Sequence, residues 1–316
     1  MSDERPRIAV ITGPTATGKS RAALDAAHAL SSQGIDACVI SMDSVQVYRH
    51  MDIGTDKLAP GDREGVEHHL IDVVAPDRTF SAAQFAKSAD RIIEETYQRG
   101  GAAIIAGGTG FYLRALQSGL FPGPGAAPEI RERLYEEAGQ EGLESLYKRL
   151  SEIDPESASR IHPNDQVRII RALEVFEVTG EPMSAHFARQ SNDGPRYPAL
   201  IIGLETDRDR MYERINARVC EMMEQGLVEE VIRLREMGYG RDLPSQQALG
   251  YKQAHMLIDG EIEQERAIYL MQRDTRHYAR RQLTWLRAEP GLRWMPVEKK
   301  HEIVARILKF IKEGNG

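Results

Sequence analysis

The sequence predicts an α/β protein in which helices flank a parallel sheet and an all-helical lobe is inserted. Along the first third of the chain, short apolar runs that suit buried strands alternate with helical patterns. Between residues 121 and 195 the strand-like runs stop, and the sequence becomes helical and highly charged. We therefore expect a core formed by residues 1–120 and 196–316, interrupted by a helical insertion of residues 121–195 that folds as a separate lobe over the core.

Four apolar runs are predicted as strands of one sheet, and helical patterns separate the first three. They are Arg7–Ile11, Ala37–Ser41, Ala102–Ala106 and Ala199–Leu204. Ligands of open parallel sheets gather at the carboxyl ends of the strands. Polar segments follow three of these strands, so residues 13–20, 43–46 and 107–109 are expected to line one crevice. Pro and Gly clusters at 121–125 and 192–195 predict the two hinges of the insertion.

Residues 13–20 read Gly-Pro-Thr-Ala-Thr-Gly-Lys-Ser and lie between the first strand and a helical stretch. This is the pattern of a phosphate-binding P-loop, so the sheet is expected to be P-loop NTPase-like. Backbone N–H groups and the helix N-terminus would bind phosphate oxygens, Lys19 would add a cation, and the Ser20 hydroxyl could ligate Mg²⁺. The predicted phosphate site comprises Gly13, Pro14, Thr15, Ala16, Thr17, Gly18, Lys19 and Ser20.

A carboxylate and a hydroxyl follow the next two strands. Asp43 could coordinate Mg²⁺ through water or accept a proton from a nucleophile, and a turn-capping aspartate is the structural alternative. The strand Ala102–Ala106 ends in Gly107-Gly-Thr-Gly110, where a P-loop hydrolase carries an acid. Thr109 suits positioning a substrate better than activating water, although a simple strand-to-helix turn would use the same residues.

Arginines mark two further places in the second half of the chain. Arg218 lies at the edge of an apolar helical stripe and needs an anion, which is either a phosphate or a neighbouring carboxylate. A later helix carries a stripe of basic residues, and such a stripe is usually a solvent-exposed helix face without a binding role. Because aromatics accompany it in an otherwise acidic chain, a nucleic-acid backbone contact is favoured for the stripe Arg273, Arg276, Arg280 and Arg287.

Composition limits the class of protein. The 316 residues carry a net charge of −7, which excludes general attraction to nucleic acid and restricts any RNA contact to a local patch. Neither a membrane-spanning run nor a signal peptide is recognisable, so a cytoplasmic location without membrane contact is expected. Two cysteines, Cys38 and Cys220, lack metal-ligand spacing. No protein partner is implied, and a monomer is expected.

Together the motifs closely resemble those of the tRNA dimethylallyltransferases, bacterial type. The resemblance rests on 13–20, on Asp43-Ser-Val-Gln-Val-Tyr48, on Gly107-Gly-Thr-Gly-Phe-Tyr-Leu113, on Ile161-His-Pro-Asn-Asp165 with Arg168–Glu174, and on Tyr278-Ala-Arg-Arg-Gln282. It implies transfer of a dimethylallyl group from dimethylallyl diphosphate to N6 of adenosine 37 in tRNA, with release of diphosphate.

The resemblance also implies roles for individual residues. Residues 13–20 would hold the diphosphate with Mg²⁺ on Ser20, Lys19 and Arg218 would offset its charge, and Asp43 would accept the N6 proton. Thr109 and Gln46 would orient an adenine extruded from the anticodon stem-loop into a channel between the lobes. The implied tRNA contacts are Asp43, Ser44, Val45, Gln46, Thr109, Val167, Arg168, Ile169, Ile170 and Arg171, to which the basic stripe adds Arg276 and Arg280.

Three other functions use the same motifs. A small-molecule kinase would bind ATP in the loop and use Asp43 as base. An adenylate isopentenyltransferase would prenylate a free nucleotide, which would leave the insertion and the arginine stripe without a role. In a non-catalytic RNA-binding protein the loop would sense a nucleotide, and Asp43 would be dispensable.

Overall fold

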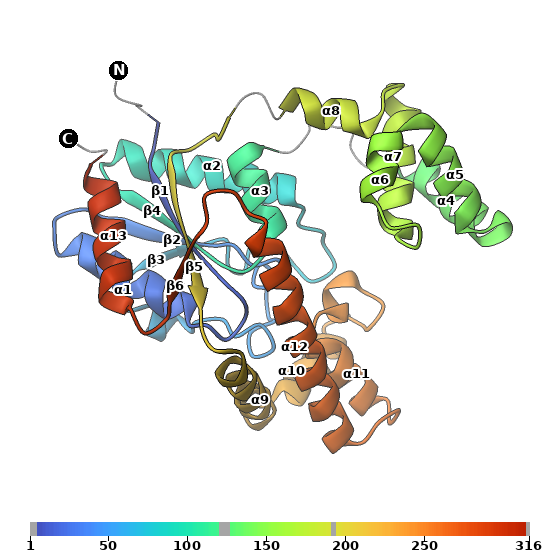
Figure 1. Cartoon of the computed structure of the whole chain (residues 1–316). Helices are drawn as coiled ribbons and strands as arrows, with labels where there is room; N and C mark the ends of the chain where they lie inside the picture. The colour runs from blue at the N-terminus through green and yellow to red at the C-terminus, as the bar shows by residue number, and fades with distance from the viewer. Residues whose placement is uncertain (1–4, 120–126, 191–193, 314–316) are drawn as a thin grey trace. The chain divides into compact units, whose positions relative to one another are not determined.

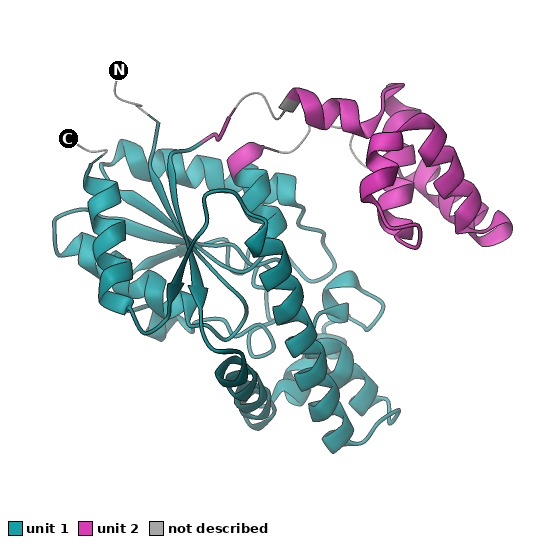
Figure 2. Ribbon diagram, in the orientation of Figure 1, with its two compact units in different colours: residues 1–116, 197–316 teal, residues 117–196 magenta. Residues whose placement is uncertain are grey.

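The structure is a computed structural model that describes residues 5–119, 127–190 and 194–313. The chain forms two compact units, Met1–Leu116 with Tyr197–Gly316 (unit 1) and Gln117–Arg196 (unit 2), as Figure 2 shows. The predicted boundary at 120/121, the hinge cluster 121–125 and residues 192 and 193 of the second hinge lie outside the described residues.

Within the described residues, six parallel strands form one sheet in unit 1, in the order β3-β2-β4-β1-β5-β6 (Figure 1). Apolar runs fully buried on both faces form its centre, as expected for parallel strands covered by helices. The predicted parallel α/β fold is confirmed. The strands are β1 Ile8–Thr12, β2 Ala37–Ser41, β3 Glu67–His69, β4 Ala102–Ala106, β5 Ala199–Glu205 and β6 Arg293–Pro296.

Helices cover both faces of this sheet. The connection through α1 runs from β1 to β2, and the connection through α2 runs back from β3 to β4. Because parallel crossovers are right-handed, these opposite directions place α1 and α2 on opposite faces. Helix α13 packs beside α1 in one apolar cluster with the strands. The bounds are α1 Lys19–Ser31, α2 Ala82–Gln98, α3 Gly110–Ser118, α13 Lys300–Lys312 and a 3-10 turn, η1, Pro60–Arg63.

A second helical layer of unit 1 follows β5 and positions the site. Its helices pack on one another around a core that includes Tyr251 and Met271, both buried. Met51, from the loop that follows β2, lies in the same core, so this loop is held between the sheet and the helices. The elements are α9 Arg208–Glu224, α10 Leu227–Glu236, η2 Pro244–Gln247, α11 Tyr251–Ile258 and α12 Gln264–Arg287.

Unit 2 is helical throughout its described part. Apolar residues at helical spacing form its own core, including Leu134, Leu146, Leu150 and Leu173. The helices are α4 Pro128–Glu141, α5 Leu143–Ile153, α6 Pro155–Arg160, α7 Gln166–Thr179 and α8 Met183–Gln190. No helix in the described segments of either unit is long and apolar enough to cross a membrane.

Candidate active site

The three predicted polar segments meet at one edge of the sheet. Strand β4 lies between β2 and β1, so the carboxyl ends of all three are adjacent. Gly107 N–H donates to Ile11 O at 3.1 Å, and Thr109 N–H donates to Met42 O at 3.2 Å. A Cβ on Gly107 would lie 2.1 Å from Met42 O, so only glycine fits there. The end of β4 therefore fixes the spacing between the P-loop and the Asp43 turn.

Some residues of the P-loop fix the conformation of the loop, and others line a cavity. Gly13 has φ 143° and Gly18 has φ 79°, both in the region that favours glycine. The Thr17 hydroxyl and the Lys19 ammonium each donate to Pro14 O at 2.8 Å, which closes the loop. A cavity of about 740 Å³ (the P-loop cavity) is lined from this loop by Thr15, Ala16, Gly18, Lys19 and Ser20. Gly13, Pro14 and Thr17 of the predicted phosphate site do not line this cavity, and they shape the loop instead.

Lys19 is the most perturbed cation of the site. Desolvation by burial lowers its pKa to about 8, with Arg218 acting in the same direction and Asp43 opposing it. A bound polyanion would reverse this shift, because it stabilises the charged form of the ammonium. Lys19 therefore suits an anionic ligand that supplies the charge removed by burial.

Asp43 begins a turn whose backbone it holds itself. Its Oδ1 accepts N–H bonds from Val45 at 2.8 Å and Gln46 at 3.3 Å. Ser44 N–H donates to the Thr109 hydroxyl at 3.1 Å, so Thr109 anchors this turn. The second carboxylate oxygen, Oδ2, makes no hydrogen bond with another described residue. It is the oxygen available to a ligand.

Two adjoining cavities open on either side of Asp43. The P-loop cavity is polar, whereas a second cavity of about 370 Å³ (the apolar cavity) has walls made largely by α9, α12 and the Gln247–Gly250 segment. Side chains of Ile215, Val219, Met222, Leu249 and Met271 line it. The two cavities adjoin each other at four shared lining residues: Thr15, Asp43, Thr55 and Arg218.

Arg218 lies at this junction with an unsatisfied donor. Its guanidinium donates to the Thr15 hydroxyl at 3.0 Å and pairs with the Asp56 carboxylate at 3.2 Å. Its Nε is buried and has no hydrogen-bond partner among the described residues. A buried guanidinium N–H without a hydrogen-bond partner is costly. Of the two predicted partners of Arg218, the structure shows the carboxylate.

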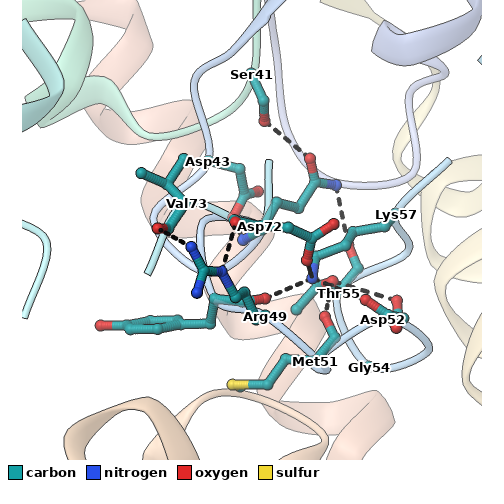
Figure 3. A network of polar contacts seen from close by, with 12 residues as sticks. Ser41, Asp43, Arg49, Met51, Asp52, Gly54, Thr55, Lys57, Asp72 and Val73 are labelled. Carbon is teal, nitrogen blue, oxygen red and sulfur yellow. Dashed lines mark hydrogen bonds and ion pairs between the residues drawn. The ribbon is translucent and has the colours of Figure 1, made fainter. Parts of the chain in front are cut away.

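The loop after the Asp43 turn is tied down by polar contacts (Figure 3). Gln46 accepts a bond from the Ser41 hydroxyl at 2.9 Å and donates to Thr55 O at 3.1 Å. Lys57 is 3% exposed and contacts Asp52 and Asp72 at 2.8 and 2.6 Å. Both ends of the Gln46 amide bond the protein, so this side chain holds the loop, and its predicted contact with adenine stays a prediction.

Gln282 of α12 ends the motif Tyr278-Ala-Arg-Arg-Gln282, and the sequence predicted no individual role for it. Its Oε1 accepts the Thr15 N–H at 2.9 Å, and its Nε2 donates to Gly108 O at 3.0 Å. A Cβ on Gly108 would lie 2.2 Å from that Nε2, and one on Gly110 would lie 2.1 Å from the Trp285 ring. These glycines therefore allow close approach of α12 rather than of a ligand, and Gln282 connects the P-loop with the β4 end.

The predicted basic stripe of α12 is only partly a free surface. Arg273 pairs with Asp274 at 2.7 Å, and Arg276 donates to Asn216 at 2.5 Å beside the Tyr212 ring. Arg280 and Arg287 are exposed and line a further cavity of about 320 Å³ together with Arg208. Free positive charge is therefore concentrated at the C-terminal half of α12.

In unit 2 the predicted tRNA-binding segment of α7 separates into two faces. Val167 is 66% exposed and the Arg168 side chain 71% exposed, whereas Ile169 and Ile170 are 0% and 1% exposed. The assignment of Ile169 and Ile170 as tRNA contacts is corrected, because the helical period turns both into the core of unit 2. Arg171 donates to the fully buried Glu174 at 2.8 Å, which ties it to the same core.

The pKa of Lys19 predicts how anion affinity depends on pH. Inorganic diphosphate should bind the protonated ammonium, so its affinity should fall as the pH rises above about 8, by up to about tenfold per pH unit. Calorimetric titration between pH 7 and 9 measures this decline. Lys19→Arg keeps its charge throughout, so its affinity should not decline. An equal decline in that variant would assign the titration to another group.

Comparison with known proteins agrees with this geometry. The sequence profile of the IPP transferase family matches residues 46–289. The tRNA dimethylallyltransferase of Geobacter sulfurreducens is 43% identical over 311 residues, covering 98% of both chains. That of Carboxydothermus hydrogenoformans is 44% identical over 295 residues, covering 93% of each.

Solved structures give the same result. The crystal structure of the full-length tRNA isopentenylpyrophosphate transferase from Bacillus halodurans aligns with a TM-score of 0.72 at 38% identity, covering 98% of both chains. A eukaryotic dimethylallyltransferase acting on tRNA aligns with a TM-score of 0.81 at 25% identity, covering 97% of this chain and 80% of that one. With matching sequence and fold over nearly the whole chain, this chain belongs to the tRNA dimethylallyltransferase family.

Proposed function

We propose that this protein transfers a dimethylallyl group from dimethylallyl diphosphate to N6 of adenosine 37 in tRNA and releases diphosphate. The observation that carries this proposal is the position of Asp43 on the wall shared by a polar cavity lined by the P-loop and an apolar cavity. An isoprenoid diphosphate has the same division into an anionic head and an apolar tail. Family membership supports the same reaction.

The diphosphate belongs in the P-loop cavity. There the α1 N-terminus, the Lys19 ammonium and the unpaired Arg218 Nε all favour negative charge. The five-carbon group would extend toward the apolar cavity, past Asp43. Arg218 gains importance as the diphosphate leaves, because the leaving oxygen takes on the electron pair of the broken C–O bond.

The transfer step forms one bond and breaks one. The adenine N6 attacks C1 of the dimethylallyl group, the bond from C1 to the diphosphate oxygen breaks, and its electron pair departs with the diphosphate. Asp43 Oδ2 accepts the N6 proton, while Oδ1 stays bonded to the turn backbone. Thr109, assigned to catalysis from the sequence, is proposed to position Asp43 by holding Ser44 N–H.

The residues present suit a Mg²⁺ ion that arrives with the diphosphate. The exposed Ser20 hydroxyl and the Asp43 carboxylate both line the P-loop cavity, and Mg²⁺ is commonly held by one or two protein oxygens together with phosphate oxygens and water. No cluster of three or more acidic, His or Cys side chains occurs among the described residues, so a dedicated all-protein cage is not proposed. When bound, the ion would neutralise charge on the leaving diphosphate.

The proposed tRNA contacts lie in both units. In unit 1 they are the Asp43 turn, with Ser44 and Val45 lining the apolar cavity, and Arg280 at the basic end of α12. In unit 2 the exposed Val167 and Arg168 are the surface-accessible members of the predicted segment. Anionic RNA would approach an acidic protein through such local basic patches.

One assay tests this function. The protein is incubated with labelled dimethylallyl diphosphate, Mg²⁺ and unmodified tRNA, in parallel with AMP in place of tRNA, and separately with ATP alone. Label should enter the tRNA and not AMP. Label in AMP would establish the adenylate isopentenyltransferase, and phosphate transfer from ATP without prenyl transfer would establish the kinase.

Removing the base without disturbing its turn should separate chemistry from binding. Asp43→Asn retains Oδ1 as acceptor for the two turn N–H groups but cannot take the N6 proton, so kcat should fall roughly 10²- to 10⁴-fold. tRNA affinity, measured by filter binding, should be mostly kept. Asp77→Asn, which removes an exposed carboxylate elsewhere on unit 1, serves as control. Unchanged turnover of Asp43→Asn would show that another group accepts the proton.

Arg280 should contribute a phosphate contact. Arg280→Ala is expected to weaken tRNA binding and to reduce the slope of log Kd against log salt by about one. Arg306→Ala is the matched control, because that arginine is paired with Glu302 at 2.9 Å on α13. An unchanged salt slope in Arg280→Ala would place the basic end of α12 outside the interface.

A further inference from the structure

A buried carboxylate in the second helical layer holds the loop that reaches the active site. Glu230 of α10 is 4% exposed and receives four hydrogen bonds. Its Oε2 accepts the N–H groups of Asp52 at 3.1 Å and Ile53 at 2.9 Å. Its Oε1 accepts the N–H of Gly54 at 3.4 Å and the hydroxyl of Tyr251 at 2.6 Å.

These contacts use the side chain of Glu230 only as a hydrogen-bond acceptor. All four partners donate to Glu230, and a carboxylate is the side chain that offers acceptors only. Desolvation by burial, reinforced by Glu230, raises the pKa of Tyr251 well above its usual value, so the Tyr251 hydroxyl keeps its proton and donates. The arrangement also fits sterically, because a Cβ on Gly54 would lie 2.4 Å from the Tyr251 ring. Glycine at 54 lets the loop lie flat against that ring.

The loop held in this way continues to Thr55 and Asp56, next to the groups to which we assign diphosphate binding. Thr55 lines both cavities, and its carbonyl accepts the bond from Gln46 (Figure 3). Asp56 pairs with Arg218, whose other edge bonds Thr15 of the P-loop. The guanidinium is therefore oriented from two sides, and one of them depends on the loop.

We infer that Glu230 is a positioning residue for the proposed prenyl transfer, acting through the 52–56 loop to orient Arg218 toward the diphosphate. Glu230 touches no substrate itself. The Asp52, Ile53 and Gly54 N–H groups have no strand or helix to pair with, and the buried carboxylate replaces that pairing. This inference rests on the proposed function, because it assigns the Arg218 site to the diphosphate of the prenyl donor.

The test measures diphosphate binding separately from turnover. Glu230→Gln offers one acceptor oxygen in place of two, which should loosen the loop and lower both the affinity for inorganic diphosphate and kcat/KM for dimethylallyl diphosphate roughly 10- to 100-fold. The Kd for tRNA should stay within about twofold. Calorimetry with inorganic diphosphate and steady-state kinetics provide the two readouts.

Two further variants separate positioning from general stability. Glu174→Gln removes an equally buried, multiply bonded carboxylate from unit 2, and it should lower thermal stability while leaving diphosphate affinity unchanged. Gly54→Ala pushes the loop away from Tyr251 with Glu230 intact, and it should reproduce the loss of affinity. It also carries the test if Glu230→Gln does not fold.

The outcomes distinguish the inference from the function on which it rests. Wild-type protein that binds inorganic diphosphate but transfers no prenyl group would overturn the proposed function. Active wild-type protein together with a folded Glu230→Gln that binds inorganic diphosphate like wild type would overturn the inference. A loss of diphosphate affinity in Glu174→Gln equal to that in Glu230→Gln would also overturn it, because general destabilisation would then explain both.

Discussion

The active site depends on a close contact between two backbones at the end of the sheet. Gly107 approaches Met42 so closely that a Cβ would lie 2.1 Å from its carbonyl oxygen, and it also donates to Ile11. This contact sets the spacing between the P-loop after β1 and the Asp43 turn after β2. Backbone atoms cannot move aside as a flexible side chain can, so the spacing is rigid. The P-loop and the Asp43 turn, to which we assign phosphate binding and proton acceptance, are thereby held at a fixed separation.

Charge in the site is balanced in advance of a ligand. Burial lowers the pKa of Lys19, and Arg218 is paired with Asp56 while its Nε has no hydrogen-bond partner among the described residues. A bound anion would stabilise the charged form of Lys19, which burial disfavours. Such preorganised charge requires no rearrangement when negative charge develops on a leaving group. The chain is therefore acidic overall, although Lys19 and Arg218 place positive charge in the P-loop cavity.

Much of the site could be predicted because its residues are contiguous. The P-loop, the Asp43 turn and the β4 end each occupy a few consecutive positions after an apolar run, and a parallel sheet brings such ends together. The hydrogen-bond partners of the individual residues in these segments could not be predicted. The Thr15 N–H donates to Gln282, the Thr15 hydroxyl accepts from Arg218, and the Gln46 amide bonds Ser41 and Thr55. These partners lie on helices and loops far away in the sequence, and no local sequence pattern shows how those elements pack together.

The sequence alone determined the four buried strands, because a continuous apolar run is stable as a strand only when it is covered on both faces. It also determined the phosphate loop and the family. It did not predict β3 and β6, which are short, partly exposed edge strands that gain their stability from pairing with β2 and β5. Only the tertiary structure turned Ile169 and Ile170 inward and brought Gln282 and Glu230 to loops more than 170 residues away. Long-range hydrogen bonds of this kind depend on how the helices pack on the sheet, and that packing is a property of the whole chain.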